Sequence, residues 1–415
     1  MFDNLLYQNV TELLSNDIKT SSIPQSILLS GPSSSGKLTC ALEIARVLSC
    51  QATGENKGSW TCTCPSCLKH KALVSSDLLL AGPRDCTLEI EAATDTFLQA
   101  VYKNASYINA TRYLHVRSVR KLTNRFSQVL WEDDDKISKI ANVISDIDEM
   151  LEELDPLHPL LEQDKLEKIC DSLLAQCHKL ENGFMYDSLP VSQIRKASKW
   201  ARYTVPEGKK VLIIENADRM QESVRNALLK ILEEPPTDTV FILTTTRRGA
   251  VMPTILSRVR PYNFASRTEE QQKEVVQRVF HANTLDSSDI SQKEIIQNHL
   301  LSYLPVKSDV ISQSALSFLH SVYNKEVPDI EKTIKDLSNF EPRVLLKLFL
   351  NALIDTHEKK LISIDNALEQ AAIQEQGYTL LKAVKDTMEY ITIYNQSPLS
   401  ALEGLVYTLL EGESK

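Results

Sequence analysis

Three short apolar runs predict the strands of an α/β core. They occupy residues 26–30, 211–214 and 240–243. Strands this apolar are typically buried on both faces, as in a parallel sheet covered by helices on each side. Residues 222–234 carry a helical pattern and end at two prolines, as a crossover helix should. The pattern therefore predicts a parallel sheet with helices on both faces.

A heptad pattern interrupts this core within residues 86–185. Over residues 137–154, isoleucine and leucine recur in alternating steps of three and four, which is the spacing of a coiled-coil seam. Similar apolar spacings lie upstream at 119–129 and downstream at 166–180. They predict a helical hairpin or small bundle whose helices bury the apolar seam against one another. Deleting residues 97–180 should then leave the core intact.

The charges of this helical insertion are segregated. Residues 132–155 hold ten acids and two lysines. The basic residues precede that stretch and comprise Arg112, Arg117, Arg120, Lys121 and Arg125. This distribution favours two solvated helix faces that attract each other across a hairpin. A partner-binding arm is the alternative.

The rest of the chain, after residue 261, is helical in pattern. The predicted fold class is therefore α/β plus all-α, with an α/β domain at 1–265 and helical domains at 266–325 and 326–415. No low-complexity linker fixes the boundary near residue 325. The chain has only 11 glycines in 415 residues, and 6% of its residues are aromatic, which disfavours an all-β fold with many tight turns.

Net charge and hydropathy limit the possible partners. The chain holds 46 Lys and Arg against 55 Asp and Glu, a formal net charge of −9, which argues against a protein that binds nucleic acid alone through a basic surface. No apolar run approaches the roughly 18 to 20 residues that a membrane span needs. Residues 1–10 lack the basic flank and apolar core of a signal peptide. We expect a cytoplasmic protein with no membrane partner.

A candidate phosphate-binding loop lies between the first apolar run and a helical pattern. Its sequence is Gly31, four residues, Gly36 and Lys37. Such a loop cradles phosphates with backbone N–H groups, and its lysine neutralises their charge. A working loop places Ser or Thr directly after the lysine to hold Mg²⁺, whereas this chain has Leu38 there and Thr39 one position late. We predict a nucleotide-binding loop that lacks the usual hydroxyl ligand for Mg²⁺.

The second apolar run ends in a further departure. Glu215 stands where a hydrolysing ATPase has its metal-binding acid, and Asn216 where it has the acid that orients water. Glu215 could still serve a metal, but Asn216 cannot act as a carboxylate base. Because these groups act as a unit, the two departures together predict impaired ATP hydrolysis. Binding of ATP with Mg²⁺ is left open.

Four cysteines fall close together and suggest a metal site. Cys50, Cys62, Cys64 and Cys67 offer four soft ligands for one tetrahedral Zn²⁺, in a knuckle at about 50–70. Such a site is closed and therefore structural. Free buried thiols are the alternative, and His70 is a possible substitute ligand. The remaining cysteines are expected to be scattered core thiols, and these are Cys40, Cys86, Cys170 and Cys177.

Arg258 follows the third apolar run. A planar, permanently charged guanidinium just after such a sheet can act as a finger on a phosphate in a neighbouring subunit. The alternative is an ordinary surface ion pair.

Taken together, these motifs resemble the AAA+ clamp-loader subunits of bacterial DNA polymerase III. Within that family, the Glu-Asn-Ala-Asp sequence at 215–218 and the missing metal ligand are more similar to delta-prime than to gamma/tau. The resemblance covers roughly residues 1–85 and 186–265. It rests on motifs in the family's order, namely the loop 31–37, the cysteine cluster, and residues 189–195, 211–218, 226–236 and 255–258.

The chain also departs from the family's usual pattern. The spacing from Cys62 to Cys64 is one residue tighter than the usual Cys-x-x-Cys, and Val259 stands where the family has cysteine after Ser257-Arg258. Residues 86–185 have no recognised counterpart.

The resemblance implies a RecA-like AAA+ domain with a zinc knuckle, a helical lid and a helical collar that oligomerises. It implies a delta-prime-like subunit that works with gamma/tau and delta subunits to load the sliding clamp onto primer-template DNA. Its own ATPase activity would be weak or absent, and Arg258 would act as the arginine finger for a neighbouring subunit. Whether the subunit is itself an enzyme within the DNA-directed DNA polymerase complex is left open. The alternatives are a gamma/tau-type ATPase and a self-contained P-loop enzyme such as a nucleotide kinase.

Overall fold

The computed structural model divides the chain into two compact units, Met1–Tyr303 and Leu304–Lys415. We call them the N-terminal unit and the C-terminal unit and describe each by itself. The structure describes residues 1–82, 86–186, 188–205, 208–282, 294–337, 342–362, 367–392 and 396–411. Parts of the predicted lid (283–293) and collar (338–341, 363–366, 393–395 and 412–415) lie outside these residues.

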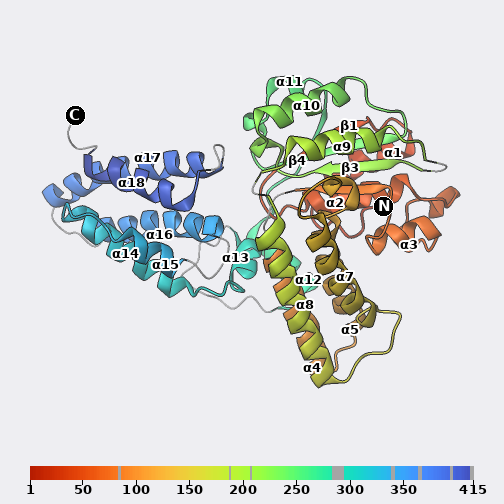
Figure 1. Ribbon diagram of the computed structural model, residues 1–415, viewed down its shortest axis with the longest axis horizontal. Coiled ribbons are helices and arrows are strands. Elements are labelled where there is room, and N and C mark those ends of the chain that lie inside the picture. Colours follow the sequence, from red (N-terminus) through yellow and green to blue (C-terminus); the bar gives the residue numbers. More distant parts are fainter. Residues whose placement is uncertain are drawn as a thin grey trace. The chain divides into compact units, whose positions relative to one another are not determined.

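A five-stranded parallel sheet forms the centre of the N-terminal unit (Figure 1), in the strand order β2-β3-β4-β1-β5. The prediction of a parallel sheet within a mostly helical α/β chain is confirmed. The strands are β1 (Ser26–Ser30), β2 (Leu78–Ala81), β3 (Lys210–Ile214), β4 (Thr239–Thr245) and β5 (Arg260–Asn263). The three apolar runs form β1, β3 and β4.

Both faces of the sheet are buried, because alternate strand residues enter two different cores. Ile27 and Leu29 pack with α1 (Val10–Lys19) and α2 (Lys37–Leu48) on one face. Leu28 belongs to the other core, which includes residues of α9 (Val191–Ala201) and α10 (Glu222–Glu233). Figure 1 shows α2 on one side of the strands and α9 and α10 on the other. Helix α10 ends before the two prolines, as the sequence predicts.

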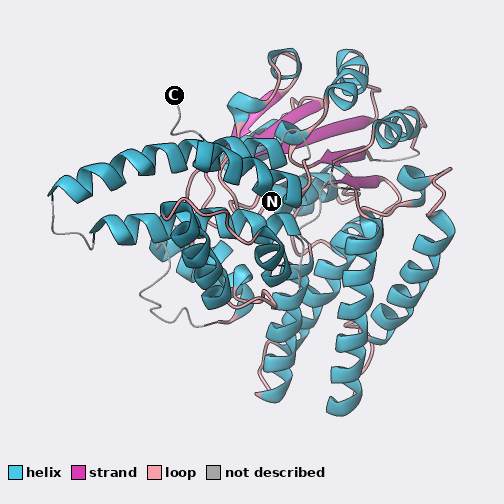
Figure 2. Cartoon of the chain, turned by 60° about the vertical axis from the view of Figure 1, so that its left-hand side comes forward, coloured by secondary structure: helices cyan, strands magenta, loops and turns pink. Residues whose placement is uncertain are grey.

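The insertion forms long helices that lie side by side and run away from the sheet (Figures 1 and 2). Helix α7 carries the predicted seam and packs on α8, with Ile140, Ile147 and Leu151 buried. The helices are α4 (Thr87–Tyr102), α5 (Ile108–Asn124), α6 (Gln128–Trp131), α7 (Ile137–Glu153) and α8 (Gln163–Phe184).

The insertion does not close on itself as the heptad pattern predicts. One continuous cluster of buried apolar residues joins these helices to the sheet, from Leu173 and Phe97 to Leu28 and Leu79. The reason lies in α4, which is not part of the seam. Its buried residues face α5 and α8, and the helix also packs on α12 (Glu269–Phe280) and α13 (Ile295–Leu301). The insertion is therefore part of the core.

The basic residues of α5 are not a solvated face, which corrects the favoured interpretation of the charge pattern. Arg112 is 2% exposed and donates hydrogen bonds to the carbonyl oxygens of Leu154 (2.8 Å) and His158 (2.9 Å). Arg117 donates to the Lys71 carbonyl (2.5 Å), and Arg120 donates to the next carbonyl, that of Ala72 (2.8 Å). The hydrogen bonds of these guanidinium groups to backbone oxygens hold them in place, and Arg120 also acts electrostatically on an acid of α7, Asp148.

The remaining helices of the N-terminal unit are short or lie after the sheet. Helix α12 begins with a capping box in which Thr268 and Gln271 satisfy each other's backbone N–H groups. The hydroxyl of Tyr303 donates to Asp95 of α4 (3.0 Å), which ties the residues after α13 to the insertion. The other two helices are α3 (Pro65–Lys71) and α11 (Pro253–Leu256).

The C-terminal unit is helical around its own apolar core. The predicted boundary near residue 325 falls inside this unit, because α14 packs on α16, with the rings of Phe318 and Phe349 at 5.4 Å edge to face. The helices are α14 (Ser308–Tyr323), α15 (Ile330–Asp336), α16 (Pro342–Ile362), α17 (Ala367–Thr392) and α18 (Pro398–Glu411).

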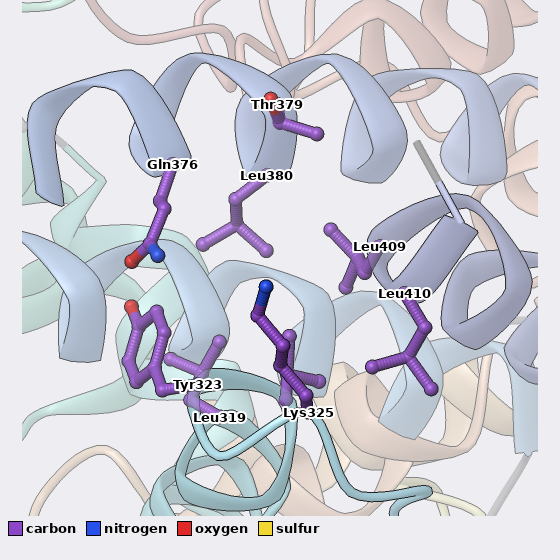
Figure 3. A pocket seen from close by; sticks show the side chains of 9 residues that line it. Leu319, Tyr323, Lys325, Gln376, Thr379, Leu380, Leu409 and Leu410 are labelled. Atoms are coloured by element: carbon purple, nitrogen blue, oxygen red, sulfur yellow. The ribbon is translucent and has the colours of Figure 1, made fainter. Parts of the chain in front are cut away.

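A small cavity of about 40 Å³ lies among α14, α17 and α18. Figure 3 shows leucines around it, with the Lys325 side chain reaching between them and Gln376 above Tyr323. The lining holds no carboxylate, histidine or cysteine. In the described part of the chain, no helix combines the length and apolar character that crossing a bilayer requires.

Candidate nucleotide and metal sites

The glycines of the phosphate-loop motif are required by space. Gly31 directly follows β1, and an added Cβ there would lie 2.6 Å from the Cβ of Phe264. Gly36 has a φ of +94°, and an added Cβ would lie 2.7 Å from a methyl group of Leu5. The chain can therefore turn from β1 into α2 at this point only with glycine at both positions.

Lys37 lies at the start of α2 and its ammonium group is turned back onto the loop. It donates hydrogen bonds to the carbonyl oxygens of Gly31 (2.8 Å) and Pro32 (2.5 Å) and to the hydroxyl of Ser35 (3.3 Å). Burial lowers the pKa of Lys37 to about 8, although the carboxylates of Asp218 and Glu215 oppose this shift. The three donors of the ammonium thus have acceptors within the loop itself.

A cavity of about 180 Å³ lies beside the loop. Arg267 lines it and was not expected from the sequence, where the only signal is a cation soon after β5. Its guanidinium donates to the carbonyl oxygens of Ser34 (2.6 Å) and Leu6 (2.9 Å), so it fixes the loop. Thr39 and Glu215 do not line this cavity. Its lining comprises Pro32, Ser33, Ser34, Ser35, Ser266, Arg267, Gln272, Glu294, Ile296 and Gln297.

Two carboxylates follow strand β3, and each is held by other groups of the chain. Glu215 forms an ion pair with Arg125, and both side chains are largely buried, at 15% and 6% exposed. Asp218 accepts a hydrogen bond from the Thr245 hydroxyl (2.6 Å) and pairs with Arg247 (3.4 Å). Asn216, between them, has a left-handed φ of +51°.

The four cysteines form one cluster, as predicted from their spacing. Their sulfur atoms all lie within 4.8 Å of one another, and the sulfurs of Cys50 and Cys62 are 3.8 Å apart. Cys64 is the N-cap of α3, with Pro65 in the first turn, and its sulfur accepts a hydrogen bond from the Cys67 N–H (3.4 Å). The local fold thus brings four soft ligands together. The cluster could hold a metal ion such as zinc.

The surroundings of the cluster act differently on two of its cysteines: burial raises the pKa of Cys67, whereas the pKa of Cys64 is lowered. Burial raises the pKa of Cys64, but hydrogen bonds from the backbone of Cys67 and Gln51 outweigh it and lower the value to about 6. The guanidinium of Arg46 donates to the Cys67 sulfur (3.1 Å) and is itself held by Glu43 at 2.6 Å. Because Glu43 balances its charge, Arg46 contributes to the cluster mainly as a fixed hydrogen-bond donor.

His70 is not a member of this group of ligands. It is 2% exposed, and neither ring nitrogen has a hydrogen-bond partner among the residues that the structure describes. Burial, with Arg46 and Arg117 nearby, lowers its pKa to about 4, so the ring is neutral at pH 7.

Arg258 follows α11 on the surface of the unit. Its guanidinium pairs with the carboxylate of Glu233 in α10 (2.7 Å) and donates to the carbonyl oxygen of Thr254 (2.7 Å). The Arg258 side chain is 31% exposed and that of Glu233 is 52% exposed. Within a single chain, the residue therefore makes the surface ion pair of the alternative interpretation. Its role toward a neighbouring subunit stays a prediction.

Comparison with known proteins places these motifs in a family context. Residues 7–153 and 162–268, together more than half of the chain, match the family model described as DNA polymerase III, delta subunit. These ranges include most of the insertion, so the expectation that residues 86–185 have no counterpart in the family was wrong. The interval between the two matched ranges is the tip of the hairpin between α7 and α8.

The similar curated proteins include both delta-prime and tau subunits. The delta-prime subunit of Haemophilus influenzae is 36% identical over 81 residues, which are 19% of this chain and 25% of that protein. The delta-prime subunit of Bacillus subtilis is 31% identical over 105 residues, 23% of this chain and 32% of that protein. The Bacillus subtilis tau subunit is 24% identical over 250 residues, 56% of this chain and 41% of that protein. The chain thus spans between a quarter and two fifths of the lengths of these relatives.

A solved structure, a DNA polymerase III gamma-subunit-related protein from Thermotoga maritima, aligns with 59% of this chain and 90% of its own. The identity is 17% and the TM-score is 0.26, and a likeness this weak supports no conclusion about fold or function.

Proposed function

Because the chain belongs to the family described as DNA polymerase III, delta subunit, we propose that it works in the clamp loader of a bacterial DNA polymerase III. The family assignment confirms the resemblance seen in the sequence. In this proposal the chain is a delta-prime-like, cytoplasmic subunit with a RecA-like AAA+ domain, a helical lid and a helical collar. Its partners are gamma/tau and delta subunits, the sliding clamp and, through the complex, primed DNA.

The observation that carries the delta-prime assignment is the state of the nucleotide loop. The loop keeps Gly31, Gly36 and Lys37 in a shape that only glycines allow, yet Leu38 supplies no oxygen for a metal. Asn216 supplies no carboxylate for the attacking water. A subunit that keeps the scaffold and lacks the catalytic groups fits a member of the ring that does not hydrolyse ATP itself.

Arg258 is the residue that we assign to a neighbour's ATP site. It is surface-placed, and its carboxylate partner Glu233 is more than half exposed. An exposed pair of this kind contributes only about 0 to 1 kcal/mol. The guanidinium can therefore exchange Glu233 for a γ-phosphate of an adjacent subunit at little cost, and its planar fork suits phosphate oxygens.

We further propose that the cysteine cluster holds one structural Zn²⁺. All four ligands come from the protein, so no position is left for a substrate. The hydrogen bonds from Arg46 and from backbone N–H groups to the sulfurs are the outer contacts that orient such ligands.

A gamma/tau-type ATPase is the second candidate, and one observation favours it. The alignment with a tau subunit covers 56% of this chain, much more than the alignments with delta-prime subunits. Steady ATP turnover by the isolated chain, lost on Lys37→Ala, would support this candidate over the first.

The test of the proposed function has two stages. Tagged chain purified from its own cells should bring down the other clamp-loader subunits in fixed stoichiometry. Failure to associate with them would contradict a place in the loader.

The second stage measures DNA-dependent ATP turnover of the reconstituted loader. Arg258→Ala should reduce it at least tenfold, because arginine fingers contribute about 10³ to 10⁵ in well-studied GTPases. Arg258→Lys should restore little. Glu233→Ala breaks the same surface pair and is the matched control: it should leave turnover unchanged. Equal losses in Arg258→Ala and Glu233→Ala would mean that only the ion pair matters and would remove the finger assignment.

A further inference from the structure

We infer that Arg125, from the helical insertion, occupies the acid that a divalent cation would need at the nucleotide loop, so that this chain binds a nucleotide phosphate there without a metal. The inference rests on the proposed function only in taking the loop of residues 31–37 as a phosphate site. It makes Arg125 a positioning residue that acts through Glu215.

The first step concerns the ligands that Mg²⁺ would need. In P-loop proteins the ion is held by a hydroxyl directly after the loop lysine and by an acid at the end of the adjoining strand. Mg²⁺ also demands near-ideal octahedral coordination by oxygen atoms. Here the first position is Leu38, and the acid at the second, Glu215, is already paired with Arg125. The residues present do not fit the ion.

The neighbouring carboxylate does not replace Glu215. Asp218 also lies near the loop lysine, since both carboxylates raise the pKa of Lys37 against the effect of burial. It accepts a hydrogen bond from the hydroxyl of Thr245 and pairs with Arg247. Both acids at this edge of the sheet are thus paired with guanidinium groups.

Arg125 is held in place by the insertion. Its guanidinium also donates to the carbonyl oxygen of Lys121 one turn earlier (2.5 Å). Its own carbonyl accepts a hydrogen bond from the Trp131 indole (2.9 Å), and that indole stacks between Phe126 and Tyr186, at 5.1 Å from each ring. The arginine is therefore fixed at the end of α5 before any ligand arrives.

Strand β2 contributes the space for the pair. A Cβ at Gly82, directly after β2, would lie 2.5 Å from a carboxylate oxygen of Glu215 and 3.2 Å from Nε of Arg125. A side chain at this position would have to displace the Glu215 carboxylate from where it pairs with Arg125. Three segments, the ends of β2, β3 and α5, are thus shaped around this ion pair.

The pair is also difficult for a metal to displace. If Mg²⁺ took Glu215, Arg125 would lose its hydrogen-bonded carboxylate while 6% exposed, and breaking a buried pair in this way is strongly unfavourable. The guanidinium and the carboxylate thus neutralise each other, and Glu215 is not available as a metal ligand.

The experiment compares ATP binding by the full-length chain in Mg²⁺ and in excess EDTA, using isothermal titration calorimetry. For the wild type we expect affinities within twofold of each other. Arg125→Gln should free Glu215, so that Mn²⁺, followed by electron paramagnetic resonance in the presence of ATP, binds at least tenfold more tightly than to the wild type. Arg125→Gln combined with Glu215→Gln should lose that gain.

Arg120→Gln is the matched control, because it removes a cation from the same helix whose partner is a backbone carbonyl distant from Glu215 along the chain. It should leave Mn²⁺ binding as in the wild type. A folded Arg125→Gln chain with no gain in Mn²⁺ affinity overturns the inference.

The wild-type measurements decide the matter even if Arg125→Gln fails to fold. An ATP affinity that rises tenfold or more with Mg²⁺, and loses this rise in Glu215→Gln, would show that Glu215 binds the metal despite Arg125. A chain that binds no ATP in either condition overturns the inference too, but it leaves the place in the clamp loader untouched, since that is tested by subunit association.

Discussion

The cysteine cluster and the nucleotide loop are both local motifs, but they differ in whether other groups of the chain already bind their functional atoms. Around the cysteines, the chain donates N–H groups to the sulfurs and leaves the four of them facing one another within 4.8 Å. At the loop, the chain's own groups occupy the functional atoms: loop oxygens accept from Lys37, and Arg125 holds Glu215. A motif predicts a working site only where nothing else in the chain competes for the same atoms.

Helix α5 contributes to both regions. Arg117 and Arg120 bind carbonyl oxygens at the end of α3, the helix that carries Cys67. At the end of α5, Arg125 binds Glu215. The same helix therefore contacts the segment that carries Cys67 at one site and pairs with the acid after β3 at the other.

The largest expected effect comes from removing metal ligands. In Cys62→Ser/Cys64→Ser, bound zinc should fall from about one ion per chain to none, and residues 50–70 should lose protection from hydrogen exchange. Structural Zn²⁺ supplies about 10 to 16 kcal/mol of apparent binding free energy in zinc-finger peptides, so ligand loss is a folding event. Cys170→Ala changes a buried cysteine outside the cluster and should keep the ion. Wild-type protein that lacks zinc after chelator-free purification would contradict the prediction.

The next effect concerns the insertion. Deleting residues 97–180 should abolish cooperative unfolding of the N-terminal unit, because these residues share one apolar core with the sheet. The expected loss is the free energy of unfolding of a whole domain, about 5 to 15 kcal/mol. Leu157→Ser alters a side chain that is 92% exposed at the tip of the same insertion and should leave the transition unchanged. Thermal unfolding followed by circular dichroism distinguishes the two outcomes. A deletion variant that still unfolds in one sharp transition would support the interpretation of the insertion as a self-contained hairpin.

The sequence predicts those features that depend on near neighbours. Strands β1, β3 and β4 are continuous apolar runs, and four cysteines within eighteen residues have little room to avoid one another. Two strands are missed because their signal is weak: β2 has four residues, and β5 is a four-residue edge strand with Pro261 and only one buried residue.

The features that the sequence does not predict depend on distant partners. Arg125 and Glu215 are 90 positions apart, and Arg267 reaches Ser34 across 233 positions. The heptad pattern describes one stripe on each helix, so it misses the packing of α4 on several neighbours. The spacing of apolar residues also cannot predict which acceptor an arginine binds. Arg112, for example, donates to a carbonyl oxygen.

A smaller effect should come from the arginines that support the cluster from α5. Arg117→Gln/Arg120→Gln removes the hydrogen bonds to the carbonyl oxygens of Lys71 and Ala72 and loosens the end of α3. Zinc affinity, measured by competition with a chromogenic chelator, should fall about 10- to 100-fold, the range seen for groups that orient metal ligands. Lys168→Gln, an exposed change on α8, is the control. Unchanged zinc affinity in the double variant would mean that the cluster is independent of the insertion.

The smallest effect tests the insertion alone, through a pH-dependent pair between α8 and α4. Nε2 of His178 lies 2.8 Å from the carboxylate of Glu91. The hydrogen bond to Glu91 raises the pKa of His178 despite burial, with a further contribution from Glu181. Because the pKa is raised in the folded state, the stabilisation is complete below the unfolded value of about 6.5 and is lost as pH rises through the folded pKa. His178→Gln should therefore lower the free energy of unfolding by at most about 1 kcal/mol at pH 5.5 and by almost nothing at pH 8.5. The loss should vanish in a Glu91→Gln background, and zinc content should not change in any of these variants. A loss of equal size at both pH values would show that His178 acts by packing and not through its charge.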